Sequence, residues 1–226
     1  MDVARNDGDL RAILSLYGYV EGDPINKVDP TGYSSRRRIF YIHGKHQRNH
    51  ARRNVNRLQN RFIVSRHDVR NASAFRRMWE SIRGNNRGNP IVVVNYHSSP
   101  TRLQGGIAAS GLQRRGINTL LLLTCNGGHN DVRNNLARQF ATSHNVGQIV
   151  AADGLHRRLR GTRGEVHAGG RNGGFRNNAT QVINSHGRSI ARAPRGLQLW
   201  DRNGNRIRNV GMRYPSVDVL LSRVGR

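Results

Sequence analysis

Several residue types are scarce in this chain of 226 residues, and each scarcity excludes a class of protein. Cys125 is the only cysteine, so no disulfide can form within the chain and its thiol is free. No apolar run approaches the roughly 18 residues of a membrane-spanning helix. The first five residues lack the basic and apolar regions of a signal peptide. We therefore predict neither a membrane span nor a secretion signal.

Acidic and aromatic residues are also few. Asp and Glu total 13, which weakens the case for a magnesium-dependent nuclease because its metal needs carboxylates. Aromatic residues make up 6% of the chain, which disfavours a protein that binds single strands by base stacking. Hydrophobic residues make up 35% and the mean hydropathy is −0.70. The core must therefore be modest and built from a few short apolar runs.

Basic residues are abundant instead. Lys and Arg total 38, which gives a formal net charge of +25, and only Lys27 and Lys45 are lysines. Such a charge attracts nucleic acid, an anionic membrane surface or an acidic protein, and Arg pairs with phosphate and carboxylate planes better than Lys does. The arginines are scattered without forming blocks, so a codon bias spread over a solvated surface explains them equally well.

Two apolar runs dominate the middle of the chain. Ile91 to Val94 and Leu120 to Leu123 are short, continuous and closed by polar residues, which is typical of strands buried on both faces of a parallel sheet. The first run leads to His97 and the second to Cys125. Because the carboxyl ends of neighbouring parallel strands meet at one crevice, these side chains form a candidate dyad for nucleophilic cysteine catalysis. A cysteine that ends an apolar strand is also often a core residue, so a structural role stays open.

Strands and helices alternate between residues 36 and 155. Strands are predicted at 38–44, from 63 onward, at the two apolar runs and at 148–152, and helices at 49–62, 73–82 with Ser73 as N-cap, 107–115 and 132–143. This alternation predicts an α/β fold, a three-layer α/β/α arrangement with a mainly parallel sheet. Residues 156–226 are predicted to be a Gly/Arg-rich loop and hairpin extension, with a β-hairpin around Asn203-Gly204 and a strand or helix at 217–224.

The N-terminal segment differs in composition from the rest. The stretch 16–33 is acidic, turn-rich and free of Arg, and its Asp23-Pro24 and Asp29-Pro30-Thr31-Gly32 resemble the closing motif of the Rhs/YD-repeat shell, Asn-Pro-x-x-x-x-Asp-Pro-x-Gly, with Asp23 in place of Asn. In that family a variable toxin begins after the motif. The resemblance implies that residues 1–35 are the end of the Rhs core and a linker, that 36–226 are a toxin domain, and that the shell cuts itself near Asp29, Pro30, Gly32 and Tyr33. A plain linker would carry similar turn residues.

The central stretch carries a second resemblance, which covers roughly residues 37 to 155. His97 after one strand and Cys125 after the next resemble the caspase-like cysteine peptidases, and Leu122-Leu123-Thr124-Cys125-Asn126-Gly127-Gly128 resembles a Leu-Leu-x-Cys-Asn-x-Gly segment of polymorphic bacterial toxin domains. His97 is followed by Ser98 where the peptidases usually have Gly, and the interval from His to Cys is shorter than is typical.

These resemblances imply an Rhs-family effector without a signal peptide that is delivered into the cytoplasm of a target cell. It would cleave a protein substrate there and be restrained in its producer by a cognate acidic immunity protein. Two alternatives remain. One is an Arg-rich toxin that acts on nucleic acid as a nuclease or modifying transferase, and the other is a non-catalytic caspase-like binding module.

Further residues are candidates for the same site. Gly127 and Gly128 before a predicted helix could form an oxyanion nest from backbone N–H groups, although a plain turn explains them equally well. Asp153 could orient an imidazole or line a substrate pocket, and a helix cap is the commoner role for such a residue. His43 is the second candidate at the strand edge and His129 the third candidate base.

A small histidine cluster also precedes the first predicted helix. His43, His46 and His50 lie close together, with the last two spaced four residues apart. Zinc would need further Cys or acidic ligands nearby, so an exposed basic turn is the favoured interpretation. We predict no metal and no cofactor.

Overall fold

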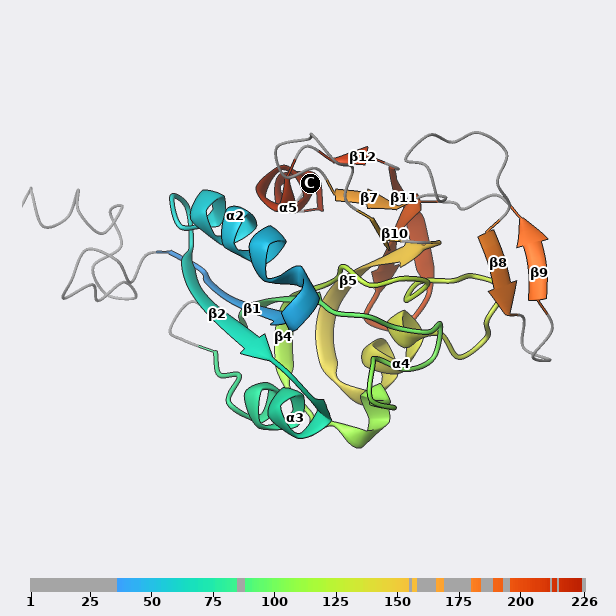
Figure 1. Ribbon diagram of the computed structural model, residues 1–226, viewed down its shortest axis with the longest axis horizontal. Coiled ribbons are helices and arrows are strands. Elements are labelled where there is room, and N and C mark those ends of the chain that lie inside the picture. The colour runs from blue at the N-terminus through green and yellow to red at the C-terminus, as the bar shows by residue number, and fades with distance from the viewer. Residues whose placement is uncertain are drawn as a thin grey trace, which may run out of the picture.

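A seven-stranded sheet in the order β11-β10-β5-β4-β3-β1-β2 organises the domain (Figure 1). The computed structural model describes residues 36–84, 88–154, 156–157, 166–168, 180–183, 189–192, 196–211, 213–214 and 216–224. The predicted Rhs end and linker at 1–35, with its processing boundary, lie outside the described residues.

Five strands of the sheet are mutually parallel. They are β1 (Arg38–Gly44), β2 (Ile63–Val69), β3 (Ile91–Asn95), β4 (Gly116–Leu122) and β5 (Asn145–Asp153). Their order, 2-1-3-4-5, is one of the two common orders of doubly wound α/β folds, in which ligands bind outside the carboxyl ends of the strands where the winding direction changes. The α/β class and the mainly parallel sheet are thereby confirmed.

The apolar strands are buried on both faces because alternate residues point to opposite sides of the sheet. In β3, Val92 and Val94 pack with the first core cluster, whereas Ile91 and Val93 pack with the second. Helices α3 (Ala72–Glu80) and α4 (Leu136–Ser143) cover the first face, and α2 (Arg48–Leu58) and α5 (Val217–Val224) cover the second (Figure 1). Helices on both faces are compatible with the three-layer arrangement.

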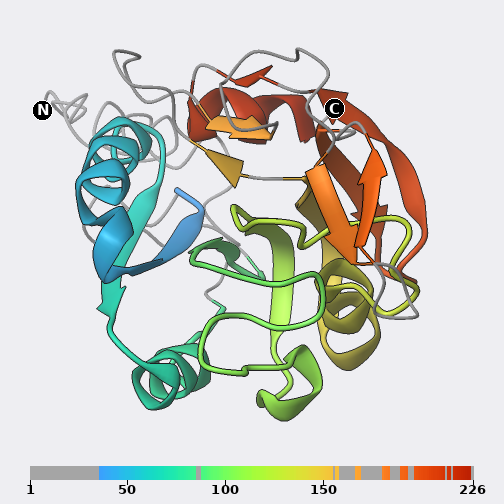
Figure 2. The same ribbon diagram turned by 45° about the vertical axis from the view of Figure 1, so that its right-hand side comes forward.

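The C-terminal part of the chain completes this sheet. Strand β10 (Gly196–Asp201) pairs antiparallel with β5, and β11 (Arg206–Gly211) pairs antiparallel with β10. Figures 1 and 2 both show this end of the sheet on the side of the molecule away from α2 and β2. The α/β core therefore continues beyond residue 155, and the residues of 156–226 that form β10 and β11 belong to the same sheet.

Short elements make up the rest of the described chain. They are the 3₁₀ turns η1 (Lys45–Gln47) and η2 (Ala109–Gly111) and the strands β6 (His156–Arg157), β7 (Val166–Ala168), β8 (Thr180–Ile183), β9 (Ser189–Arg192) and β12 (Arg213–Tyr214). The three strands β12, β7 and β6 form one small sheet, and β8 and β9 form another. Most of the predicted Gly/Arg-rich loop lies outside the described residues.

The structure corrects three predicted helices. The segment 107–115 contains only the turn η2, because Gly105 and Gly106 adopt positive φ and Ile107 bridges back to Leu103. Helix α3 is capped by Asn71, whose side-chain oxygen accepts the Ala74 N–H at 2.8 Å, two residues earlier than the predicted cap Ser73.

The third correction concerns α4, which begins at Leu136 and not at Val132. Asn135 caps it, since its Oδ1 accepts the Arg138 N–H at 3.0 Å. Residues 217–224, for which a strand and a helix were both open, form helix α5.

Candidate active site

The loops that follow β3 and β4 lie side by side at the carboxyl edge of the sheet. Val94 is the register partner of Leu122, and the Leu123 N–H donates to the Val94 carbonyl at 2.9 Å. Beyond the strands, the Ser98 hydroxyl donates to the backbone carbonyl of Cys125. Cys125 is half-buried and is the one cysteine of the chain. The structure thus brings the segment of His97 and that of Cys125 to one edge, as the two apolar runs predict.

His97 itself is exposed and is contacted by the turn that follows β1. The side-chain amide nitrogen of Gln47 lies 3.1 Å from the His97 Nε2, and the His46 ring centroid lies 6.2 Å from that of His97. The side chain of Gln47 therefore helps to orient the His97 imidazole.

Ser98, and not His97, makes the hydrogen bond to the Cys125 carbonyl. Ser98 is the residue that stands where the caspase-like peptidases usually have Gly.

A tight turn follows Cys125. Asn126 has φ 56°, and it is the one residue other than Gly with positive φ in the part of the chain that the structure describes. Asn adopts this conformation more readily than most residues do. The Asn126 N–H donates to the Gly154 carbonyl at 2.7 Å, and the Gly128 N–H donates to the Ala152 carbonyl at 2.8 Å. The turn is therefore fastened to the end of β5.

These bonds correct the predicted oxyanion nest. The Gly128 amide is already bonded and cannot serve a tetrahedral intermediate without losing that bond. The two glycines also do not open a helix, since α4 begins only at Leu136. Among the amides of Asn126, Gly127 and Gly128, only that of Gly127 has no backbone partner within the described residues.

The glycines are required by close packing. A Cβ on Gly128 would lie 2.8 Å from the Ala151 carbonyl oxygen and 2.9 Å from the Ala151 Cβ, and a Cβ on Gly127 would lie 2.6 Å from the Thr124 Oγ1. Real Cβ atoms essentially never approach so closely. Gly128 thus allows the loop after Cys125 to lie against β5, and Gly127 allows it to turn tightly against Thr124.

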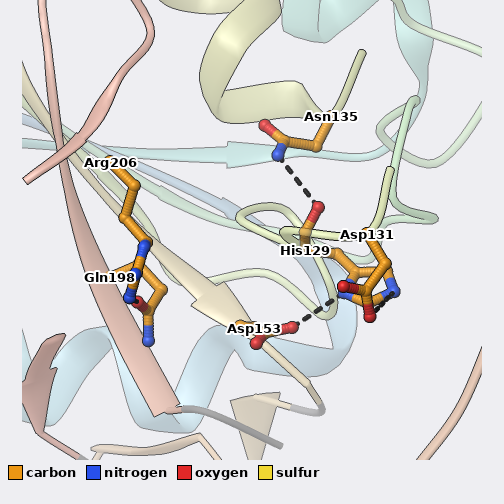
Figure 3. A network of polar contacts seen from close by, with 6 residues as sticks. All are labelled: His129, Asp131, Asn135, Asp153, Gln198 and Arg206. Carbon is orange, nitrogen blue, oxygen red and sulfur yellow. Dashed lines mark hydrogen bonds and ion pairs between the residues drawn. The ribbon is translucent and has the colours of Figure 1, made fainter. Parts of the chain in front are cut away.

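A buried imidazole–carboxylate pair lies beside this loop (Figure 3). The His129 Nδ1 donates to the Asp153 Oδ1 at 2.8 Å, and both side chains are 0% exposed. On the other side of the ring, the His129 Nε2 lies 4.0 Å from the Oδ2 of Asp131, which is partly exposed. The Asn135 side chain also donates to the His129 carbonyl at 2.9 Å. The ring is therefore held between two carboxylates, as Figure 3 shows.

The pair settles which of the suggested roles Asp153 has in the structure. It orients an imidazole, that of His129 and not that of His97, and it caps no helix within the described chain. The signal for this pairing was present in the sequence, because His129 follows β4 and Asp153 ends β5, and the carboxyl ends of these neighbouring strands meet.

A second buried polar network, which no local sequence pattern predicts, joins β1, β3 and α2. The side-chain amides of Asn54 and Asn95 donate to the Tyr41 hydroxyl at 2.9 and 3.3 Å. The same two amide nitrogens lie 3.4 and 3.2 Å from the ring nitrogens of His50. Burial raises the pKa of Tyr41 to about 12, and burial followed by the nearby Arg53 lowers the pKa of His50 to about 4. Both groups are therefore neutral near pH 7.

His43 does not line the open edge as predicted. It is the second-last residue of β1 and has 0% exposure, and its Nδ1 donates to the Gly44 carbonyl at 3.0 Å. Burial is the main cause that lowers its pKa. A neutral, buried ring at the end of a strand is a core histidine, so its access to a substrate is excluded in this conformation.

A basic hollow of about 420 Å³ opens beside His97, at the carboxyl ends of β1, β2 and β3. It is lined by Gly44, Lys45, His46, Arg48, Val69, Arg70, Tyr96 and Gln104. Gly44, Val69 and Tyr96 are its buried members. Arg48 also pairs with Asp68, with Nε and Oδ2 at 2.9 Å. This basic lining attracts an anionic group. Because His46 lines the hollow and its ring lies next to that of His97, the group would be close to His97.

Acid should destabilise this domain through His50. Its pKa of 6.5 in the unfolded chain falls to about 4 in the fold, so the unfolded state binds the extra proton between these values. The free energy of unfolding has its full value above pH 6.5. It falls by up to about 3 kcal/mol as the pH is lowered towards 4, because the unfolded state then binds a proton at His50. His43 and His144, whose pKa values burial also lowers, act in the same direction.

Urea unfolding at about pH 7 and about pH 4.5 measures this loss. A His50→Gln variant, which keeps a polar side chain on α2 but cannot titrate, should show a smaller difference between the two pH values. Equal differences in the variant and the wild type would rule out His50 as the cause.

None of the helices in the described chain is long and apolar enough to cross a membrane. Comparison of the sequence and structure with models of protein families, with curated proteins and with solved structures finds no match.

Proposed function

We propose that this chain is the toxin region of an Rhs-type effector and that it is a caspase-like cysteine endopeptidase, with Cys125 as nucleophile and His97 as base. The observation that carries the proposal is the contact between the loops after β3 and β4, in which Ser98 bonds the Cys125 carbonyl. A half-buried thiol and an exposed imidazole then stand on adjacent loops at the edge where doubly wound sheets bind ligands.

The reaction follows from these groups. The Cys125 Sγ attacks the carbonyl carbon of a peptide bond, and the His97 imidazole takes the thiol proton and passes it to the leaving amine nitrogen. Water then adds to the thioester, which releases the carboxylic acid and restores the thiol. The Gly127 N–H is our candidate donor to the oxyanion, because its neighbours' amides are bonded to β5 residues and Gly154.

His129 and Asp153 supply a second candidate for the base. An imidazole oriented by a carboxylate is the arrangement that a nucleophile and its base generally need. The pair is fully buried and begins four residues after Cys125. His97 remains our first choice because it is exposed to an incoming substrate.

In this proposal the toxin cleaves a protein in the cytoplasm of a target cell, and an acidic immunity protein restrains it in the producing cell. The net charge of +25 supports an acidic antidote, because opposite charges speed association. The nucleic-acid-directed toxin remains the alternative, and the same charge favours it.

The reactivity of the thiol tests the proposal without knowledge of the substrate. Between about pH 6 and pH 7, Cys125 should react with iodoacetamide at least about tenfold faster than a small-molecule thiol, because a thiolate stabilised by positive surroundings is the reactive form. Intact mass spectrometry gives the rate directly, since the chain has no other cysteine.

The control is His97→Ala, in which the rate should fall towards that of an unassisted thiol. A wild-type rate below that of the small-molecule thiol would mark Cys125 as a shielded core residue and would remove the basis of the peptidase proposal.

A further inference from the structure

The outermost strand at one end of the sheet, β2, lies between two helices that carry exposed arginines. Helices α2 and α3 flank it on opposite faces of the sheet (Figure 1). Arg52 on α2, Arg66 on β2 and Arg76 and Arg77 on α3 are all exposed, and we call these four residues with the β2 backbone the β2 edge. Between residues 36 and 84 the only acidic residues are Asp68 and Glu80. The β2 edge is therefore strongly positive.

The contact between Arg48 and Asp68 shows which side of α2 faces β2. The Arg48 Nε lies 2.9 Å from the Asp68 Oδ2, so the first turn of α2 lies over β2. Arg52 follows Arg48 by four residues and lies on the same side of the helix. With Asp68 already paired, no acid on β2 offsets Arg52 or Arg66.

The backbone of β2 has an open side. The Ile63 N–H donates to the Arg37 carbonyl at 3.1 Å, on the β1 side. In a parallel ladder alternate residues bond the same neighbour, so Ser65 and His67 also bond β1. The N–H groups of Val64, Arg66 and Asp68 then point away from it, and no further strand of the described sheet pairs with them. Such an edge is a template for another extended chain.

We propose that the β2 edge binds an acidic segment of a partner protein, which adds as a strand beside β2. Successive side chains of the added strand would point to opposite faces of the sheet. Acids on one face would lie towards α2, which carries Arg52, and acids on the other would lie towards α3, which carries Arg76 and Arg77. Main-chain hydrogen bonds give affinity and the charges select the partner. A nucleic acid would use the arginines and leave the strand edge unpaired, so the edge favours a polypeptide.

The β2 edge is separate from the proposed catalytic residues. In the sheet order β4-β3-β1-β2, two strands lie between β4, which leads to Cys125, and β2, and one strand lies between β3, which leads to His97, and β2. Binding at the edge therefore does not depend on the peptidase proposal, and each can fail alone.

A synthetic peptide tests the inference on the full chain. The probe is a peptide of about ten residues that mixes Glu with Thr and Val, and its control has Lys in place of Glu. The Glu peptide should bind, weaken as salt rises from about 50 to about 300 mM, and protect the amides of β2 from hydrogen exchange. The Lys peptide should not bind.

Two pairs of variants separate backbone from charge. Arg66→Pro removes an outward N–H without removing a bond to β1, and it should weaken binding at least about tenfold relative to Arg66→Gln, which loses the same charge. The triple variant Arg52→Gln, Arg76→Gln and Arg77→Gln should weaken binding by a similar factor. Its control, Arg114→Gln, Arg133→Gln and Arg202→Gln, removes three exposed arginines elsewhere and should change binding less than about twofold.

Circular dichroism shows whether Arg66→Pro is folded, and if it is not, the exchange of the wild-type β2 amides decides. Peptide binding without protection of β2, or equal binding by the two Arg66 variants, would overturn strand addition. A short DNA duplex that binds more tightly than the peptide, and loses its binding in the triple variant, would show a nucleic-acid surface instead.

Discussion

Under the proposed function, Cys125→Ala should abolish toxicity in a target cell and lower the peptidase rate by at least about a thousandfold, because the reaction loses its nucleophile. The domain should stay folded, since Cys125 is only half-buried in a loop beyond the end of β4 and the substitution removes one sulfur atom. The measurements are survival of cells that express the toxin and the rate of cleavage of a mixed peptide library.

His97→Ala should reduce the same rate by at least about a hundredfold, the lower end of what a general base contributes. Thermal unfolding of each variant shows that the loss is chemical and not structural. If His97→Ala keeps its rate while folded His129→Gln loses it, the base is the buried imidazole. If Cys125→Ala is folded and fully toxic, the peptidase proposal is wrong and the nucleic-acid alternative takes its place.

Asp153→Ala should destabilise the domain by about 1–3 kcal/mol, the cost of leaving a buried donor without its acceptor. The His129 N–H at Nδ1 would lose its acceptor where the ring has 0% exposure. Because the free energy of unfolding of such domains is only about 5–15 kcal/mol, this one carboxylate contributes a large part of it. Urea unfolding near pH 7 measures the change.

Asp131→Ala is the matched control. Its carboxylate lies 4.0 Å from the other ring nitrogen but is 31% exposed, so its loss should cost less than about 1 kcal/mol. Equal costs for the two variants would contradict the view that burial, and not charge alone, makes the Asp153 contact strong.

The central sheet was predictable because its signal is local. Runs such as Ile91 to Val94 are too short and too uniformly apolar for a surface helix, and their placement on parallel strands brings the loops after β3 and β4 together. The same rule predicts that Cys125 and His97 share an edge. It does not show that Ser98 makes the hydrogen bond between the loops.

The remainder depends on contacts distant in sequence. Gly105 and Gly106 prevent the helix predicted at 107–115, but that depends on backbone angles that a periodic pattern does not encode. The pairing of β10 with β5 joins Gly196 to Asp153 across more than forty residues, which no local pattern indicates. The Tyr41–Asn54–Asn95 network, likewise, requires three elements to be in place before any of its bonds can form.

The position of β10 also sets an order of events during synthesis, in which the chain emerges N-terminus first. Residues 36–153 arrive before β10 and α5, and until then β5 has an open edge beside Val150, Ala152 and Asp153. Leu197 and Trp200 of β10 each join one of the two cores. A chain that lacks β10 therefore has an unpaired β5 edge and two incomplete cores.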